Sequence, residues 1–290
     1  MTKSFRDRIQ EPGTFLLDGA TGTELSRRGF DTSGPSWTVA AIRECPDLLE
    51  QIHRDYVEAG AELITANTFR TQARSLVSLG WEHEAKELTS EAVEIARRAA
   101  TDWSFVAGSV SPLADCYSPK LTPAESDLER EHREHARNLA SAGVDLILVE
   151  TQITHREAVI AARAAAETGV PFAVSFVTYS NGNLLSGESL GPALREIAEL
   201  CPAAFLLNCI PAHEALATLR QHLHRNPDVR WGAYANTGRR TATGSWESTH
   251  AENPAVYAGF AKDWRESGLT WIGGCCGTTP EHISSLSKVL

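Results

Sequence analysis

The sequence predicts an α/β protein built as a single (β/α)8 TIM barrel spanning residues 1–290. Short apolar or β-branched runs alternate with stretches of helical periodicity, which favours parallel strands joined by crossover helices. Eight such strands occur in a chain of 290 residues, a usual length for this barrel. No linker rich in proline or serine divides the chain, so we expect one domain.

Each predicted strand is a short apolar run, and the long helices between the strands are amphipathic. The segment "TFLLDGATG" (14–22) is predicted to be a strand that ends at Asp18 and enters a glycine-rich turn. The first long helix, 46–60, places Ile52 and Tyr56 on its apolar face and stops at Gly60. The other predicted strands are 61–69, 105–110, 144–151, 171–177, 203–209, 229–238 and 269–276, and the other predicted helices are 84–101, 123–142, 155–168, 188–200, 213–225, 253–267 and 280–289.

The main alternative fold is a doubly wound open sheet. That fold usually carries the phosphate-binding pattern G-x-G-x-x-G directly after its first strand. The corresponding segment here, "DGATGTEL" (18–25), spaces its glycines differently. The barrel is therefore the better prediction.

Composition excludes several classes of partner. Lys and Arg number 27 against 37 Asp and Glu, a formal charge of −10, so neither nucleic acid nor an anionic membrane is an expected partner. The N-terminal segment has no apolar stretch typical of a secretion signal, and no apolar run approaches the roughly 20 residues of a membrane-spanning helix. We therefore expect a cytoplasmic protein with reduced thiols, in which a cysteine cluster indicates metal binding or catalysis.

Polar residues gather at the ends of the predicted strands. In a (β/α)8 barrel the chemistry lies at the C-terminal ends of the strands. Two of these ends carry carboxylates, which a purely structural strand does not need, so we expect a functional site at this rim. The residues at the strand ends are, in chain order, Asp18, Asn67, Ser109, Glu150, Ser175, Asn208 with Cys209, Asn236, and Cys275 with Cys276.

Three of the six cysteines lie on this rim, at the ends of predicted strands six and eight. Neighbouring strands are about 4.8 Å apart, so strand ends two positions apart lie within roughly 10 Å of each other. Cys209, Cys275 and Cys276 can then bind one zinc ion with Zn–S distances of about 2.3 Å. Adjacent strand residues normally point to opposite faces, but the glycines of "GGCCG" (273–277) allow backbone angles that turn both sulfurs inward.

The alternatives to a catalytic zinc site are packing thiols, a disulfide and a structural zinc site. We expect Cys45, Cys116 and Cys201 to be small packing thiols. A disulfide between adjacent cysteines is strained and unfavoured in a reducing compartment. A structural zinc site normally has four protein ligands, whereas three ligands with an open position are typical of a catalytic site.

Three thiolates on zinc favour one kind of chemistry. They leave the site with a net charge of −1, which makes it poor at activating water but able to hold an incoming thiol as a reactive thiolate. The expected substrate is therefore a small thiol that acts as a nucleophile. Asp18 and Glu150 suit the ammonium group of an amino-acid thiol, and the backbone of residues 19–23 suits its carboxylate. Alternatively, Asp18 caps its own turn and Glu150 pairs with an arginine such as Arg156.

These motifs together resemble the zinc-dependent homocysteine S-methyltransferase family. The domain of this family also occurs in betaine–homocysteine methyltransferase and in cobalamin-dependent methionine synthase. The segments that carry the resemblance are "LLDGATGTEL" (16–25), "AGAELITANTF" (59–69), "ILVET" (147–151), "NC" (208–209) and "IGGCCGTTPEHI" (272–283).

The resemblance implies a (β/α)8 barrel that transfers a methyl group to homocysteine and produces methionine. It implies Zn2+ held by Cys209, Cys275 and Cys276, with the homocysteine thiolate as fourth ligand. Asp18 and Glu150 would lie near the amino group of the substrate. The substrate-binding residues that we predict at the rim are Asp18, Gly19, Asn67 and Glu150.

The chain is most similar in length to family members that use S-methylmethionine or S-adenosylmethionine. The donor would then be a sulfonium cation, and the loop 238–253, with Trp246, Glu247 and His250, is predicted to close over it. Alternatives are betaine, another onium compound, a methyl-corrinoid or folate on a partner protein, or thiol binding without turnover. The other expected partners are small molecules only, and the sequence makes no prediction of oligomeric state.

Overall fold

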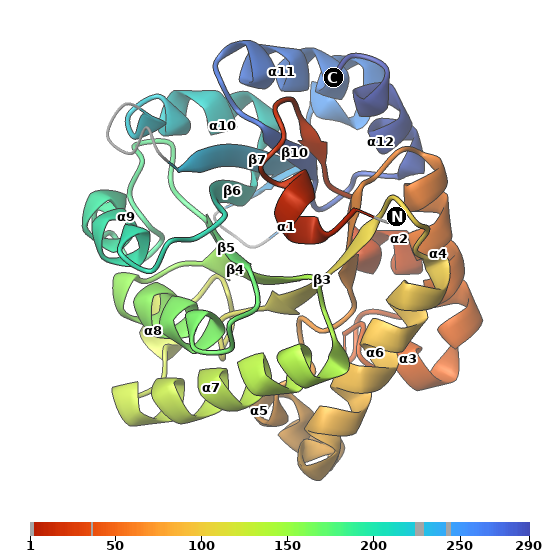
Figure 1. The fold of residues 1–290 in the computed structure, drawn as a ribbon, viewed down its shortest axis with the longest axis vertical. Helices are drawn as coiled ribbons and strands as arrows, with labels where there is room; N and C mark the ends of the chain where they lie inside the picture. The colour runs from red at the N-terminus through yellow and green to blue at the C-terminus, as the bar shows by residue number, and fades with distance from the viewer. Residues whose placement is uncertain (1–2, 36, 224–228, 242–244) are drawn as a thin grey trace.

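Eight parallel strands form a barrel in the computed structural model, which describes residues 3–35, 37–223, 229–241 and 245–290 (Figure 1). The strands pair in the order β1-β10-β7-β6-β5-β4-β3-β2. A bridge between Leu17 and Leu63 joins the two ends of this series, so the barrel closes. The predicted fold is confirmed. The strands are β1 (Phe15–Leu16), β2 (Leu63–Ala66), β3 (Phe105–Val110), β4 (Leu146–Gln152), β5 (Phe172–Phe176), β6 (Ala204–Pro211), β7 (Arg230–Asn236) and β10 (Trp271–Gly274).

Helices surround the barrel, and local sequence signals set their ends. Helix α7 stops at Gly143, which adopts a left-handed conformation with φ 80°. Helix α11 starts at Pro254, and the side chain of Asn253 accepts hydrogen bonds from the next free backbone N–H groups. The long helices are α4 (Pro46–Glu58), α6 (Ala85–Ala99), α7 (Glu125–Ala142), α8 (His155–Ala166), α9 (Leu190–Ala198), α10 (Ala212–Leu219), α11 (Pro254–Glu266) and α12 (Pro280–Ser287).

Several boundaries differ from the predicted ones. The predicted strand 14–22 is too long, because the chain turns after Leu17 and residues Thr21–Arg27 form helix α2. Helix α10 ends at Leu219, not at residue 225, which lies outside the described residues. Short elements that the sequence did not predict are α1 (Phe5–Arg8), α3 (Ala41–Glu44), α5 (Ala73–Leu76), the 3-10 turns Val77–Leu79, Glu82–Glu84, Pro119–Leu121 and His250–Glu252, and an antiparallel hairpin of β8 (Gly238–Arg240) and β9 (Trp246–Ser248).

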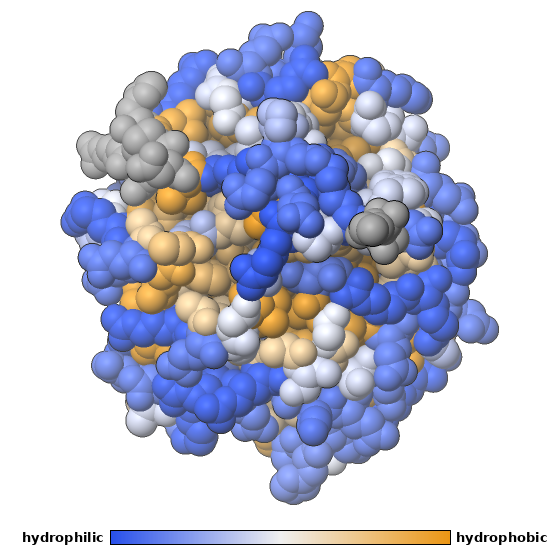
Figure 2. Space-filling view, in the orientation of Figure 1, coloured by the Kyte–Doolittle hydropathy of each residue, from blue (hydrophilic) through white to orange (hydrophobic). Residues whose placement is uncertain are grey.

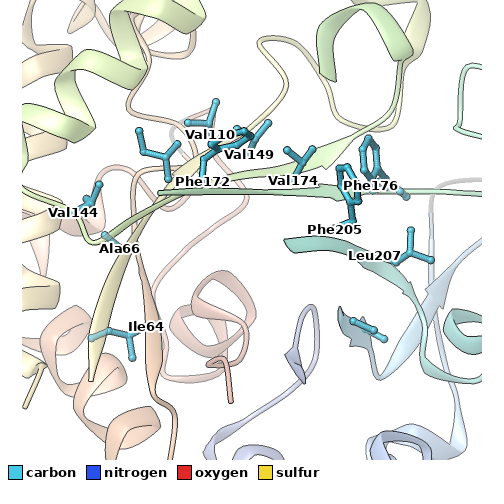
Figure 3. Close-up of a cluster of buried hydrophobic side chains, with 14 of the residues drawn as sticks. Ile64, Ala66, Val110, Val144, Val149, Phe172, Val174, Phe176, Phe205 and Leu207 are labelled. Carbon is cyan, nitrogen blue, oxygen red and sulfur yellow. The ribbon is translucent and has the colours of Figure 1, made fainter. Parts of the chain in front are cut away.

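Alternation along the strands divides the buried residues into two layers. In β4, Leu146 and Leu148 belong to the cluster inside the barrel, whereas Ile147 and Val149 belong to the cluster between barrel and helices. Figure 3 shows part of the outer layer, with Ile64, Ala66, Val110, Val144, Val149, Phe172, Val174, Phe176, Phe205 and Leu207 labelled.

An aromatic plug fills the N-terminal end of the barrel. Phe5 of α1 packs against Phe15, Phe105 and Trp271, with ring centroids 5.3–6.4 Å apart. Figures 1 and 2 look onto this end, where α1 crosses the barrel as a hydrophilic ridge with apolar surface beside it. The interior is therefore sealed on this side, which leaves the opposite end for a site. None of the helices in the described part of the chain is long and apolar enough to cross a bilayer.

Tyr257 of α11 ties β7 to β10. Its hydroxyl accepts a hydrogen bond from Ala235 N–H at 3.0 Å and lies 2.9 Å from the Ala235 carbonyl and 2.8 Å from the Gly273 carbonyl. We expect Tyr257→Phe to lower the free energy of unfolding by about 1–3 kcal/mol, because buried backbone groups lose their partner. The measurement is urea unfolding followed by circular dichroism. Tyr179→Phe is the control, because Tyr179 is 52% exposed; equal midpoints for the two variants would contradict the prediction.

Candidate active site

Polar side chains form the uppermost layer inside the barrel. Leu146 and Leu148 of β4, like Ala204 and Leu206 of β6, point into the barrel. The next inward-facing position of each strand, towards its C-terminal end, is polar. Such positions hold Ser109, Glu150, Ser175, Asn208 and Tyr234, all of which are buried. The predicted rim of polar residues is therefore present at the C-terminal strand ends.

Asn208 holds two irregular strand ends together. Its Oδ1 accepts hydrogen bonds from Thr151 N–H at 3.1 Å and from Ser175 Oγ at 2.7 Å, and its Nδ2 donates to Thr151 Oγ1 at 2.9 Å. Thr151 and the neighbouring Cys209 both have positive φ angles, 62° and 53°. The pairing register shifts at both places, which is typical of β-bulges that re-aim side chains near active sites.

The three predicted cysteines converge at the mouth of the barrel. Cys209 Sγ lies 3.1 Å from Cys275 Sγ, and Cys275 Sγ lies 4.0 Å from Cys276 Sγ. All three sulfurs are within 4.8 Å of one another. Three sulfurs in tetrahedral positions at about 2.3 Å from one zinc ion would be about 3.8 Å apart. The Cys209–Cys275 distance is shorter than this value and the Cys275–Cys276 distance is slightly longer.

Cys275 and Cys276 share this cluster because they lie in a turn, beyond the end of β10. Thr278 N–H donates to Cys275 O at 3.0 Å and closes the turn, and Gly277 has φ 84° at the position where a type II turn requires it. The explanation predicted for the other glycines was wrong. Gly273 and Gly274 have no positive φ; instead they leave room, because a Cβ on Gly274 would lie 2.4 Å from Thr278 Oγ1.

The thiols influence one another's ionisation. Hydrogen bonds, first from Cys209 and then from Cys275, lower the pKa of Cys276 well below its usual range. The pKa of Cys209 is raised, chiefly by its contact with Cys275, and that of Cys275 is raised as well. Three adjoining thiolates repel one another strongly without a cation between them. The donor set and its spacing therefore fit a soft divalent metal such as zinc.

Glu150 is buried near the cysteines, and no arginine among the described residues pairs with it. Its carboxylate accepts hydrogen bonds from Ser109 Oγ and, at 3.0 Å, from the Tyr234 hydroxyl. Arg156, the partner considered from the sequence, instead donates to Pro123 O. Burial raises the pKa of Glu150 to about 7, and the charge of Cys275 adds to the shift.

Asp18 does not cap its own turn. Its carboxylate accepts hydrogen bonds from Thr65 N–H at 2.7 Å and from Thr65 Oγ1 at 3.2 Å, which connects the end of β1 to β2. Burial raises its pKa to about 7, and the charge of Glu150 contributes in the same direction. No ion pair to either carboxylate occurs among the described residues. The site therefore holds two buried acids, and the described residues supply no cationic partner to either of them.

Gly19 and Asn67 lie beside these acids in tightly packed surroundings. A Cβ on Gly19 would lie 2.7 Å from the Tyr56 ring and 2.8 Å from Thr278 Oγ1, so no larger residue fits. Asn67 exchanges two hydrogen bonds with Thr38, from Thr38 Oγ1 at 2.7 Å and to Thr38 O at 2.8 Å. Asn67 thus fixes the chain that follows α2, and its direct contact with substrate remains a prediction.

Part of the loop 238–253, which was predicted to close over the donor, forms the β8–β9 hairpin. Trp246 is 44% exposed and lies against Gly238, and Glu247 pairs with Arg239 at 2.8 Å. His250 begins a 3-10 turn. Residues 242–244 lie outside the described part of the chain, so closure over a donor remains a prediction.

The remaining cysteines only partly match their predicted packing role. Cys116 is buried and Cys45 is half-buried, as expected. Cys201 is exposed, because it lies in a turn after α9 with φ 55°, so the prediction for it was wrong.

Two residues near the site were missed from the sequence. Tyr234 lies inside β7, before the polar strand end at Asn236, and the sequence gives no sign that its hydroxyl reaches Glu150. Tyr117 lies in the loop after β3, so a search for polar residues at strand ends does not find it. The charge of Cys209, followed by burial, raises the pKa of the Tyr117 hydroxyl well above its usual range. Tyr117 therefore lies close to the cysteine cluster.

Comparison with known families agrees with this geometry. Residues 15–290 match the family model described as homocysteine S-methyltransferase. The chain belongs to the homocysteine S-methyltransferase family. Its members include enzymes of methyl transfer, and the predicted family resemblance is confirmed.

Individual members of the family are similar over nearly the whole chain. The homocysteine S-methyltransferase of Escherichia coli (strain K12) is 30% identical, with 97% of this chain and 96% of that protein covered. A selenocysteine methyltransferase of Astragalus bisulcatus is 29% identical, with 95% and 92% covered. The crystal structure of the homocysteine methyltransferase MmuM from Escherichia coli in its metallated form matches with a TM-score of 0.85 at 28% identity, covering 98% of both chains.

The burial of Asp18 makes the free energy of unfolding depend on pH. Its pKa rises from 3.8 to about 7 on folding, so between about pH 4 and pH 7 the folded chain keeps a proton that the unfolded chain has lost. The stabilisation is complete below the unfolded pKa, and the free energy of unfolding falls as pH rises through this window. We expect Asp18→Asn to reduce this fall by roughly 1–4 kcal/mol.

The measurement is urea unfolding at several pH values between 4 and 8, with a metal chelator present. Asp102→Asn is the control, because Asp102 is an exposed aspartate outside the site. A fall in Asp18→Asn as steep as in the wild type would show that Asp18 does not carry the effect.

Proposed function

We propose that the protein transfers a methyl group from a sulfonium donor to the sulfur of homocysteine, giving methionine, and that it depends on Zn2+. One observation carries the proposal: three cysteine sulfurs lie within 4.8 Å of one another beside two buried carboxyls. Membership of the homocysteine S-methyltransferase family supports the acceptor and the reaction. The metallated form of the similar enzyme MmuM supports a metal.

Cys209, Cys275 and Cys276 would hold the zinc. Thiolates are soft ligands that suit zinc, and three of them leave one coordination position open. When bound, the metal supplies a positive charge that favours the thiolate form of the acceptor sulfur at neutral pH. The turn around Gly277 and the bulge at Cys209 fix the three sulfurs in position before any substrate arrives.

Asp18 and Glu150 would bind the α-ammonium group of homocysteine. Both carboxyls are buried and have raised pKa values, so a cation between them would lower the pKa of each and stabilise the ionised forms. Thr65, Ser109 and Tyr234 hold the two carboxylates in place through hydrogen bonds. Backbone N–H groups near Gly19 are the proposed partners of the α-carboxylate.

The methyl transfer needs few protein groups. The acceptor thiolate attacks the methyl carbon in line with the departing sulfur; a new S–C bond forms and the C–S+ bond breaks. Its electron pair stays on the donor sulfur, which leaves as a neutral thioether. Opposite charges cancel during this step, so a dry site favours it. The buried, aromatic-plugged interior below the rim keeps water away from one side.

The family also includes proteins named for selenocysteine, so a second acceptor is worth testing. Purified, zinc-loaded protein would be incubated with homocysteine or selenocysteine. Each acceptor would be tested with S-methylmethionine, S-adenosylmethionine or betaine, and the products read by mass spectrometry. We expect methionine with a sulfonium donor. If methionine formed only with betaine, betaine would be the donor and the sulfonium proposal would be wrong. If no tube contained a product, a separate methyl-carrying partner or binding without turnover would be favoured.

Loss of a single ligand should remove the metal and the activity together. We expect Cys276→Ala to lose bound zinc, measured by atomic emission after dialysis, and to lower kcat/KM at least 100-fold. The reason is that the two cysteines that remain would bind zinc weakly. The matched control is Cys201→Ala, since Cys201 is exposed and outside the cluster. Full zinc content and wild-type turnover in Cys276→Ala would refute the ligand assignment.

A further inference from the structure

A tyrosine and an arginine meet at the same end of the barrel as the cysteine cluster. The guanidinium carbon of Arg240, at the end of β8, lies 4.1 Å from the centroid of the Tyr117 ring. This distance is well inside the roughly 6 Å limit of a cation–π contact. Tyr117 is half-buried and Arg240 is exposed, so the contact lies where the site meets solvent.

The hairpin connects Arg240 to the backbone of the cysteine turn. Thr237 N–H donates to Cys276 O at 3.0 Å, and Arg240 follows only three residues later. Thr249 Oγ1 donates to Thr237 O at 2.6 Å, which fixes the other end of the hairpin to the same point. The Tyr117 ring, which contacts Arg240, therefore lies at the same end of the barrel as the thiols, in agreement with the effect of the Cys209 charge on the pKa of its hydroxyl.

Arg240 differs from its neighbour Arg239 in how its charge is satisfied. Arg239 pairs with Glu247 across the hairpin at 2.8 Å. Arg240 makes no direct ion pair with a carboxylate among the described residues; it contacts the ring of Tyr117, and its charge acts on the carboxyl of Asp115 from a greater distance. Its exposed guanidinium can move into water at little cost, so the ring face is available to another cation.

We propose that Tyr117 is a specificity-determining residue that selects a cationic methyl donor, and that Arg240 occupies its ring face until the donor replaces it. This inference rests on the proposed function and assigns the donor side of the same site. A sulfonium accepts no hydrogen bond and donates none through its sulfur, so an aromatic face is one of the few groups that recognise it. A neutral donor would displace Arg240 without replacing the cation–π contact, and would bind less well.

Direct binding of a small cation tests the proposal without turnover. The probe is trimethylsulfonium, its neutral comparison is dimethyl sulfide, and binding is measured by ligand-observed NMR on the zinc-loaded protein. We expect Arg240→Gln to bind trimethylsulfonium about 3- to 30-fold more tightly than wild type. Tyr117→Phe should bind like wild type, whereas Tyr117→Leu should lose the preference for the cation over dimethyl sulfide. Arg239→Gln and Tyr179→Leu are the matched controls and should behave like wild type.

Kinetics provide a second readout. Tyr117→Leu should raise KM for S-methylmethionine about 10-fold or more, with unchanged KM for homocysteine and unchanged zinc content, and Arg240→Gln should lower KM for the donor. Equal cation binding by Tyr117→Leu and wild type would overturn the inference even if methionine is formed. Ring-dependent binding of trimethylsulfonium without methionine from any sulfonium donor would instead overturn the proposed reaction and leave Tyr117 as a cation site.

Discussion

The buried amide of Asn208 is the interaction on which the site depends most. It joins the ends of β4, β5 and β6 through Thr151 and Ser175, and it immediately precedes Cys209. Thr151 is β-branched, and a left-handed conformation is costly for such a residue, so its surroundings must hold it there. The amide supplies this restraint with two hydrogen bonds to Thr151, and a third to Ser175 holds the amide itself. Glu150 and Cys209 are thereby fixed near the ends of β4 and β6, on either side of β5.

The barrel interior changes character along its axis, and this change produces the site. Aromatic side chains from α1, β1, β3 and β10 fill the N-terminal end, and aliphatic residues fill the middle. Only the last inward-facing layer is polar, and its hydrogen bonds are made largely within the layer. Because water is excluded from below, Asp18 and Glu150 are desolvated and their pKa values rise. An acid pair in this state is suited to bind an ammonium group.

Three kinds of group at the rim divide the proposed reaction between them. In the proposal, the cysteine sulfurs would hold the metal that binds the acceptor sulfur, the buried acids would bind the amino end of the acceptor, and the Tyr117 ring would face the donor. The first two are built on strands and the tight turn after β10, which are rigid. Tyr117 and Arg240 come from a loop and a hairpin that sit on top of the barrel. The proposed acceptor site therefore uses preformed geometry, whereas the proposed donor side lies on a loop and a hairpin, the kinds of segment best able to vary between related proteins.

The sequence by itself determined the barrel, the rim and the three cysteines, because strand periodicity places every strand end on one side and the "NC" and "GGCCG" segments lie at such ends. It did not determine which partner each polar group has. Glu150 binds Ser109 and Tyr234 where Arg156 was considered, and Asp18 binds Thr65 where a local cap was considered. It also missed α1, the β8–β9 hairpin and Tyr117. The strands of the hairpin are three residues long and largely exposed, so they leave no apolar alternation to detect. The positions of α1 and Tyr117 depend on contacts with residues far apart in the chain, which leave no local periodicity either.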